Sequence, residues 1–220
     1  MLSTERIERI SRYKLKEDRI RSILSEILVK YMLCEQHQLL LEEINFKYNE
    51  YGKPFLLEPY NVYFNISHSG QWIICGSSDT PIGVDIEGRT TGIMSIANRF
   101  FSRNEYDYIR NECSINQKDM FCKIWTLKES YIKCIGKGLC IPLQSFRFEF
   151  YRDEIKMYNN DIINLDYLFA SKKIDNDYHM AVCTMKNGCN IWDGNIEIIS
   201  VETLLNWKND RIVNFNKHVW

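Results

Sequence analysis

The sequence predicts an α+β fold, in which helical segments and short strands follow one another along the chain. Three patterns indicate it: apolar residues at helical spacing over 20–31, alternating apolar residues over 82–87, and a second helical spacing over 121–135. The 45% of hydrophobic and 26% of charged residues are typical of globular proteins, so collagen-like, coiled-coil and disordered classes are excluded.

The first helix is predicted at residues 16–35. Its apolar side chains recur at the spacing of one helix face, and they are Ile20, Ile23, Leu24, Ile27, Leu28 and Tyr31. Residues 1–30 carry eight basic and five acidic side chains, hence a net charge of +3. Arg6, Arg9 and Arg21 in this segment are either a solvated face or contacts for an anion.

A β-hairpin is predicted next. A turn at 51–54 (Tyr-Gly-Lys-Pro) precedes two apolar strands, at 63–66 and 72–76, and the polar segment 67–70 (Ser-His-Ser-Gly) joins them. The sequence therefore predicts a hairpin with a polar tip.

Three polar side chains of this region are candidates for binding a phosphate. Ser67 and His68 lie in the predicted tip, where backbone N–H groups, hydroxyls and an imidazole could converge on an anion. Lys53 lies in the preceding turn. A loop histidine and a turn lysine are more often simply solvated, so both interpretations stay open at this point.

A strand with two acidic residues is predicted at 81–87 (Pro-Ile-Gly-Val-Asp-Ile-Glu). Its branched apolar residues share one face, whereas Asp85 and Glu87 share the other, with Cα atoms roughly 7 Å apart. Two carboxylates at this spacing are suitable ligands for Mg²⁺. An exposed acidic pair on a strand is, however, usually a solvated face.

Helical stretches are predicted at 93–110 and 117–135. The first contains Ser102 and Glu105 at the spacing of a capping box, and the second ends at the Gly-Lys-Gly segment 136–138. In the last third of the chain, strands are predicted at 146–150, 180–183 and 196–198.

Glu129 and Lys133 are one turn apart on the second of these helices, so they share a face. A surface ion pair is the structural interpretation. If this face meets Asp85 and Glu87, a third carboxylate and an ammonium group join them. That combination supplies what phosphoryl transfer needs, namely ligands for a metal and a cation for developing negative charge.

No feature of the whole chain indicates nucleic acid or a membrane as partner. The 28 Lys and Arg residues balance 29 Asp and Glu residues, so the basic footprint of a DNA-binding protein is absent. The sequence has no apolar core of a signal peptide and no stretch of ~18 apolar residues. The eight cysteines lack zinc-binding spacing, so we expect reduced thiols and a cytoplasmic protein.

Taken together, the motifs resemble the Sfp-type 4′-phosphopantetheinyl transferases over about residues 3–203. They occur in the order of that family, as YGKP at 51–54, FNISHS at 64–69, PIGVDIE at 81–87, RFFS with Glu105 at 99–105, WTLKESYIK at 125–133, GKG at 136–138 and MAV at 180–182. The combination of the GVDIE and WTLKESYIK motifs is the most specific part of the resemblance.

The resemblance implies a monomer of two similar α/β halves, 1–79 and 80–220, related by a pseudo-twofold axis. The active site would lie in the cleft between them and hold coenzyme A. The chain departs from the family in three respects. The family's opening strand has no counterpart before 3–12, arginine replaces a familiar lysine at Arg6 and Arg9, and the tail 206–220 matches no part of the family.

The resemblance also implies roles for single residues. Asp85, Glu87 and Glu129 would bind Mg²⁺ together with the pyrophosphate of coenzyme A, and Mn²⁺ takes the same oxygen ligands. The phosphates would be contacted by Arg6, Arg9, Arg21, Ser67, His68, Lys128 and Lys133, with Lys53 near the adenine.

The implied reaction is attack of a carrier-protein serine on the β-phosphate of coenzyme A, which transfers phosphopantetheine and releases 3′,5′-ADP. Asp85 would act through the metal, Lys133 would stabilise the leaving phosphate, and Glu129 would take the serine proton. The partner would be an apo acyl or peptidyl carrier protein of fatty-acid, polyketide or nonribosomal peptide synthesis. It would dock on 89–110, where Ile93 and Met94 are either apolar contacts or core residues.

Two other functions use the same residue types. A metal-dependent nuclease also places Asp, Glu and Lys close together, but its Glu-x-Lys pair normally lies on a strand, and this chain is close to neutral. A catalytically inactive protein that binds coenzyme A or a carrier protein is the second alternative. Loss of a carboxylate would favour it, and all three carboxylates are present.

Overall fold

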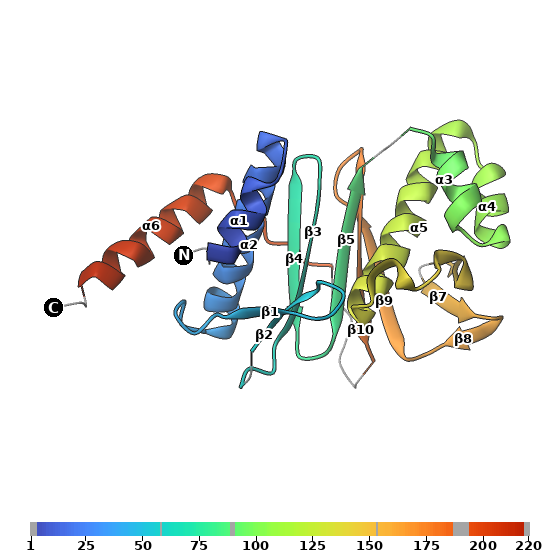
Figure 1. Cartoon of the computed structure of the whole chain (residues 1–220). Coiled ribbons are helices and arrows are strands. Elements are labelled where there is room, and N and C mark those ends of the chain that lie inside the picture. Colours follow the sequence, from blue (N-terminus) through green and yellow to red (C-terminus); the bar gives the residue numbers. More distant parts are fainter. Residues whose placement is uncertain (1–3, 58, 89–90, 153, 187–193, 218–220) are drawn as a thin grey trace. The chain divides into compact units, whose positions relative to one another are not determined.

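The computed structural model describes residues 4–57, 59–88, 91–152, 154–186 and 194–217 (Figure 1). Helices and antiparallel sheets both contribute to it, which confirms the predicted α+β class. The chain divides into two compact units, one formed by its ends (Met1–Ile44 and Ile196–Trp220) and one by Asn45–Asn195. Among the described residues, no helix is both long and apolar enough to span a membrane.

The unit formed by the chain ends is helical in its described part, with α1 (Thr4–Ser11), α2 (Lys16–His37) and α6 (Val201–Lys217). Helix α2 confirms the helix predicted at 16–35, and its buried face overlaps the predicted stripe only in part. Ile27 of the stripe is buried and Ile20 is 44% exposed, while Val29 and Leu33, outside the stripe, are buried. Apolar residues cover more than one side of α2, so their spacing alone does not select the buried face.

The approach to α6 corrects one prediction. Residues 196–198, predicted as a strand, form no strand and precede the helix. The apolar residues that alternate here are not buried against a sheet, since Ile196 and Ile198 are 41% and 74% exposed. The Ser200 hydroxyl accepts a hydrogen bond from the Thr203 N–H at 3.0 Å and caps the first turn of the helix that follows.

Helix α6 contains most of the tail that matched no motif, and it packs on α2 through an aromatic residue. The Trp207 ring meets the Tyr31 ring edge to face, with centroids 5.5 Å apart. Its Nε1 donates a hydrogen bond to Glu35 Oε1 at 2.8 Å. The two ends of the chain are therefore held together by α2 and α6.

The central sheet of the larger unit has the order β5-β10-β9 and is antiparallel. Its strands are β5 (Ile82–Gly88), β10 (Tyr178–Met185) and β9 (Tyr167–Lys173), and they confirm the strands predicted at 81–87 and 180–183. Its side chains form a core cluster that includes Ile82, Val84, Ile86, Met180 and Val182.

Helix α5 (Ser114–Ile135) lies against this sheet, as the period at 117–135 predicts (Figure 1). The contact with β5 is very close at one point, because a Cβ atom on Gly83 would lie 1.9 Å from the carbonyl oxygen of Ser130. Only glycine permits this approach. The helix ends at Gly136, whose φ of 80° is the left-handed conformation typical of a C-terminal glycine.

The predicted hairpin is formed by β3 (Tyr63–Ser69) and β4 (Trp72–Ser78). Its strands are longer than predicted, because β3 continues through Ser69 and only Gly70 and Gln71 turn the chain. The predicted tip at 67–70 is therefore wrong. A second hairpin, β1 (Phe46–Tyr48) with β2 (Pro54–Leu56), encloses the turn predicted around Gly52, whose φ is 85°.

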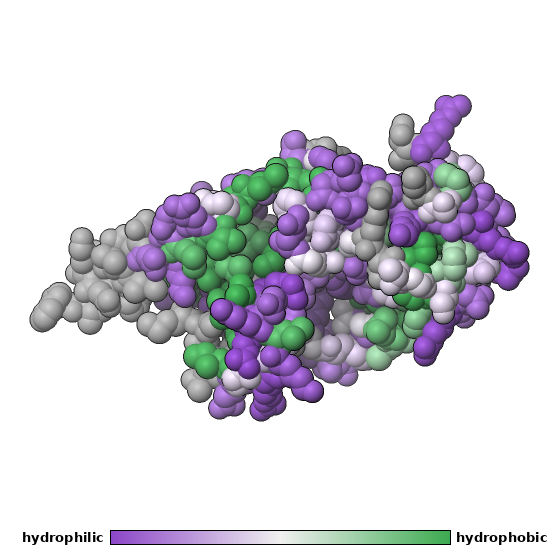
Figure 2. Space-filling model, turned by 90° about the horizontal axis from the view of Figure 1, so that it is seen from above, coloured by the Kyte–Doolittle hydropathy of each residue, from purple (hydrophilic) through white to green (hydrophobic). Residues whose placement is uncertain are grey.

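The remaining elements form a helical and a sheet layer at the end of this unit. They are α3 (Ile93–Phe100), α4 (Arg103–Arg110), the 3₁₀ turns η1 (Gly138–Cys140) and η2 (Leu143–Ser145), and the antiparallel strands β6 (Phe146–Tyr151), β7 (Glu154–Asn159) and β8 (Ile162–Asn164). Strand β6 and the capping box of Ser102 with Glu105 confirm their predictions. Figure 2 shows mainly hydrophilic residues over the end that carries α3 and α4.

Candidate functional site

The acidic side chains of β5 lie on the face of the strand that meets α5. Side chains alternate along a strand, so Asp85 and Glu87 share the face of Gly83, where a Cβ atom would meet the α5 backbone. Asp85 is 5% exposed and Glu87 is half-buried. Glu129 and Lys133 lie one turn apart on α5, and both interact electrostatically with Asp85. The structure therefore brings together the two acidic motifs that the sequence singles out.

Lys133 is paired with the strand and not with its helix neighbour. Its Nζ donates to Asp85 Oδ1 at 2.6 Å and to Ser67 Oγ at 2.8 Å. The Ser67 hydroxyl in turn donates to the same Asp85 oxygen at 2.7 Å. Burial raises the pKa of Asp85, although Lys133 and Ser67 lower it in part. This ion pair with Asp85 thus takes the place of the surface pair with Glu129 that the helix spacing alone would favour.

Glu129 is a second carboxyl group of this cluster with a raised pKa. Its pKa is raised to about 7, mainly by burial and also by repulsion from Asp85 and Glu87, while Lys133 opposes the shift. A carboxyl group with this pKa exchanges its proton close to neutral pH. Glu129 therefore has the acid–base properties of a general base, which fits the role predicted for it.

The predicted magnesium site would consist of the carboxylates of Asp85, Glu87 and Glu129. Among the described residues, no group of three or more His, Cys, Asp or Glu side chains is arranged to hold a metal ion. The Lys133 ammonium group is instead the cation beside Asp85. The chemistry of the donors does suit Mg²⁺, because carboxylate oxygens are its usual protein ligands and a divalent cation would relieve the repulsion that raises the pKa of Glu129.

Ser67 and His68 do not converge on one point, contrary to the prediction of a phosphate-binding tip. They are neighbours on β3, so their side chains point to opposite faces. Ser67 is buried against Asp85, and His68 is exposed. The predicted turn is wrong because Ser-His-Ser-Gly has the composition of a turn while its first three residues continue the strand. The phosphate contacts of Ser67 and His68 stay predictions.

Lys53 has a structural role at the end of α5. Its Nζ donates to the carbonyl oxygens of Ile82, Lys133 and Cys134 at 3.0, 2.6 and 3.1 Å. Burial lowers the pKa of this ammonium group. Two of these acceptors, the carbonyl oxygens of Lys133 and Cys134, lie in the last turn of α5, so the Lys53 ammonium group caps the helix that carries Glu129. This position differs from the solvated turn or adenine contact considered from sequence.

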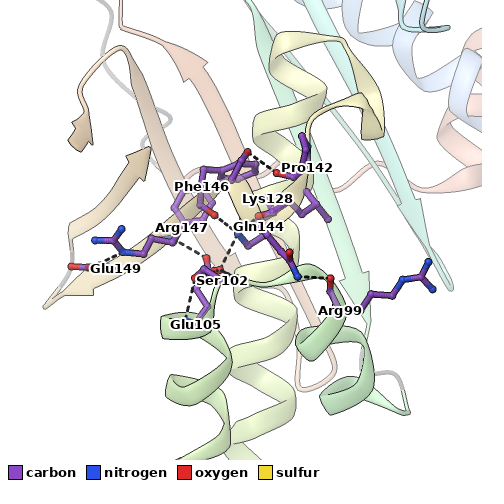
Figure 3. A network of polar contacts seen from close by, with 12 residues as sticks. Arg99, Ser102, Glu105, Lys128, Pro142, Gln144, Phe146, Arg147 and Glu149 are labelled. Carbon is purple, nitrogen blue, oxygen red and sulfur yellow. Dashed lines mark hydrogen bonds and ion pairs between the residues drawn. The ribbon is translucent and has the colours of Figure 1, made fainter. Parts of the chain in front are cut away.

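Lys128 is also structural, which corrects its predicted phosphate contact (Figure 3). Its side chain is fully buried, and Nζ donates to the carbonyl oxygens of Leu143 and Phe146 at 2.8 and 2.7 Å. Glu105 Oε2 lies 2.9 Å away. Burial lowers the pKa of Lys128, and Glu105 offsets part of that effect. Lys128 and Glu129 are adjacent on a helix, so they face different directions.

The arginines predicted to contact coenzyme A belong to the other compact unit. Arg21 lies on α2 and pairs with Asp18 at 2.5 Å. The side chains of Arg6 and Arg9 lie outside the described residues. The roles of these three arginines therefore remain predictions.

The predicted carrier-docking residues are mostly core residues. Ile93 is 8% exposed and belongs to the cluster beneath α3, and Met94 is half-buried against the same cluster. The alternative of core packing is therefore correct for Ile93. Helix α3 is amphipathic, and Ile93 is its first residue on the buried side.

The partners of three polar residues in and around the site were not predicted from the sequence. Ser69 Oγ donates to Glu87 Oε1 at 2.8 Å, and Asn65 Oδ1 accepts the Val84 N–H at 2.8 Å. Glu105 is the buried partner of Lys128. The alternation of polar residues at positions 65, 67 and 69 was a signal for the first two, since such residues share one strand face.

Two family models match this chain. One, described as 4′-phosphopantetheinyl transferase, N-terminal, covers residues 1–80, and the other, described as 4′-phosphopantetheinyl transferase superfamily, covers residues 81–183. The 4′-phosphopantetheinyl transferase ffp of Bacillus subtilis is 38% identical over 93% of this chain and 90% of the relative. The 4′-phosphopantetheinyl transferase Sfp of Bacillus subtilis (strain 168) is 37% identical over the same shares. The 4′-phosphopantetheinyl transferase gsp of Aneurinibacillus migulanus is 41% identical over 66% of this chain and 60% of the relative.

Proposed function

Because the chain belongs to the 4′-phosphopantetheinyl transferase superfamily, we propose that it transfers 4′-phosphopantetheine from coenzyme A to a serine of an apo carrier protein. The protein is thus an enzyme, and 3′,5′-ADP is the second product. The observation that carries the proposal beyond family membership is the cluster of Asp85, Glu87, Glu129 and Lys133 between β5 and α5.

The residues of the cluster fit the two demands of this reaction. The serine hydroxyl must lose its proton, and the Glu129 carboxylate, beside Asp85 and Glu87, is the acceptor that we propose. The leaving phosphate gains negative charge, and the Lys133 ammonium group can offset it. Two of the three N–H groups of the Lys133 ammonium donate to Ser67 and Asp85, so the third can donate to a phosphate oxygen.

Asp85, Glu87 and Glu129 are the residues that would hold Mg²⁺. When bound, the metal supplies positive charge that polarises the pyrophosphate of coenzyme A. Mn²⁺ uses the same oxygen ligands and is the natural substitute in an experiment.

We further propose that residues 1–79 and 80–220 act as two similar halves around bound coenzyme A. The enzyme is expected to act as a monomer on carrier proteins of fatty-acid, polyketide or nonribosomal peptide synthesis. A cytoplasmic location suits the seven free cysteines among the described residues.

The test is mass spectrometry of a purified apo carrier protein after incubation with this enzyme, coenzyme A and Mg²⁺. The expected result is a gain of one phosphopantetheine, lost with EDTA and in the Asp85→Ala variant. Lys173→Ala, which removes an exposed ion pair with Asp119, is the matched control and retains the transfer. A folded wild-type protein that binds coenzyme A but modifies none of several apo carriers would instead indicate a binding protein.

A further inference from the structure

Strands β3 and β5 belong to different sheets, and a row of polar side chains joins them. Alternate residues of β3 accept hydrogen bonds from alternate backbone N–H groups of β5. The pairs are Asn65 with Val84 at 2.8 Å, Ser67 with Ile86 at 3.4 Å and Ser69 with Gly88 at 3.3 Å. Both members advance in the same direction along the chain, so the two segments run parallel.

Two of these three contacts also reach a carboxylate. The Ser67 hydroxyl donates to Asp85, and the Ser69 hydroxyl donates to Glu87 Oε1 at 2.8 Å. At the Asn65 level the corresponding residue of β5 is Gly83, which has no side chain. The row therefore separates into one contact that only joins the strands and two that also hold acidic side chains.

Glu87 depends on its serine more than Asp85 does. Asp85 Oδ1 is held by Lys133 as well as by Ser67. Glu87 is half-buried and longer, and its Oε1 accepts hydrogen bonds from the Ser69 hydroxyl and from the Gly88 N–H at 3.0 Å. A glutamate loses more rotamer freedom than an aspartate when it is ordered, so a fixed donor matters more for Glu87.

We propose that Ser69 is a positioning residue that fixes the Glu87 carboxylate on the strand face it shares with Asp85, so that this ligand needs less reordering when the metal binds. This inference rests on the proposed function, because it assigns a partner to a proposed metal ligand. Residues that hydrogen-bond to metal ligands fix their orientation, and their loss usually lowers metal affinity by about 10- to 100-fold. Ser69 itself touches neither coenzyme A nor the metal in this assignment.

The experiment measures Mn²⁺ binding to the full-length protein in the absence of substrates, from the electron paramagnetic resonance signal of free Mn²⁺. In Ser69→Ala we expect the affinity to fall about tenfold. Ser69→Thr restores the hydroxyl and the affinity. In the transfer assay, Ser69→Ala needs about tenfold more Mg²⁺ for half-maximal rate, while the rate at saturating Mg²⁺ changes little.

Asn65→Ala is the matched control, because it removes a contact of the same row without touching a carboxylate. It lowers the melting temperature and leaves the Mn²⁺ affinity unchanged. If Ser69→Ala does not fold, the nearly isosteric pair Ser69→Thr and Ser69→Val gives the same comparison with and without the hydroxyl.

The inference is overturned if the variants with and without the hydroxyl bind Mn²⁺ equally, or if Asn65→Ala weakens binding as much as Ser69→Ala. A failure of the proposed function gives a different result, because the wild-type protein would then transfer no phosphopantetheine at any Mg²⁺ concentration. If the wild type is active and Ser69→Ala behaves like it, only the role of Ser69 is rejected.

Discussion

Glu129 lies half-buried beside Asp85 and Glu87, and its carboxyl group has a pKa of about 7 in the folded protein against an ordinary value of 4.5. Between these values the folded protein binds a proton that the unfolded chain has released. The stability from this group is therefore fully present below about pH 4.5 and is lost as the pH rises through about 7.

Replacing Glu129 with Gln should remove this pH dependence in the metal-free protein. We expect Glu129→Gln to be more stable than wild type, with an advantage about 1–2 kcal/mol larger at pH 8 than at pH 5 after allowing for solvent screening. Urea unfolding at both pH values in EDTA measures the difference. An equal effect at pH 5 and pH 8 would show that Glu129 is not protonated at neutral pH.

Lys128 gives a second prediction at the scale of one residue, since its ammonium group is buried with Glu105. Lys128→Met leaves the Glu105 carboxylate buried without its cation, and we expect a loss of about 3–5 kcal/mol in the free energy of unfolding. Adding Glu105→Gln should recover part of that loss. Urea unfolding and the KM for coenzyme A are measured together. A raised KM with unchanged stability would instead support a phosphate contact.

The single residues show where sequence reasoning succeeds. Strand alternation placed Asp85 on a defined face and helix spacing placed Glu129 and Lys133 on another, and the family resemblance implied that the two faces meet. Lys53 and Lys128 were not recognised as structural. A lysine that binds backbone carbonyls and one that binds phosphate have the same local sequence, and only the fold distinguishes them.

At the scale of elements, α5 and β5 carry the site, and their separation depends on Gly83. A Cβ at this position would meet the Ser130 carbonyl oxygen at 1.9 Å and the Cys134 nitrogen at 2.4 Å, both of them backbone atoms. Gly83→Ala must therefore push the helix away from the strand. We expect a loss of about 3 kcal/mol or more in stability, together with loss of transfer, because Lys133 and Glu129 move with the helix.

Gly76→Ala is the matched control for this prediction. Its Cβ would lie 3.1 and 3.3 Å from side-chain atoms of Val84 and Ile82, which can adjust more easily than backbone. Melting temperatures and transfer rates of both variants are compared with wild type. If the two alanine variants behave alike, the close approach of α5 and β5 does not control the site.

The elements were predicted best where the apolar spacing is long and regular. Helix α5 and strand β5 satisfy this condition. Strand β3 was predicted too short because its last residues, Ser67 to Ser69, are polar. They are strand residues nonetheless, since their hydroxyls find partners on β5. A polar strand end that faces another polar strand cannot be distinguished from a turn by composition.

At the scale of the whole molecule, the chain ends form one compact unit, and their contacts are far apart in sequence. Trp207 and Glu35 are separated by 172 residues and share a hydrogen bond of 2.8 Å. Helix α6 could not be predicted to pack on α2, because no local pattern reports a partner at that distance. The strand prediction at 196–198 is wrong because apolar residues alternate there, but the segment pairs with no strand of the described residues.

Trp207 therefore tests how the two ends hold together. Trp207→Ala removes both the ring contact with Tyr31, at 5.5 Å between centroids, and the hydrogen bond to Glu35. We expect the free energy of unfolding to fall by about 2–3 kcal/mol. Trp207→Phe keeps an aromatic ring and loses only the N–H donor, so its cost should be about 1 kcal/mol.

Urea unfolding followed by far-ultraviolet circular dichroism measures both variants. Wild-type stability in Trp207→Ala would mean that α6 adds nothing to α2, and equal losses in both variants would assign the contact to the hydrogen bond alone.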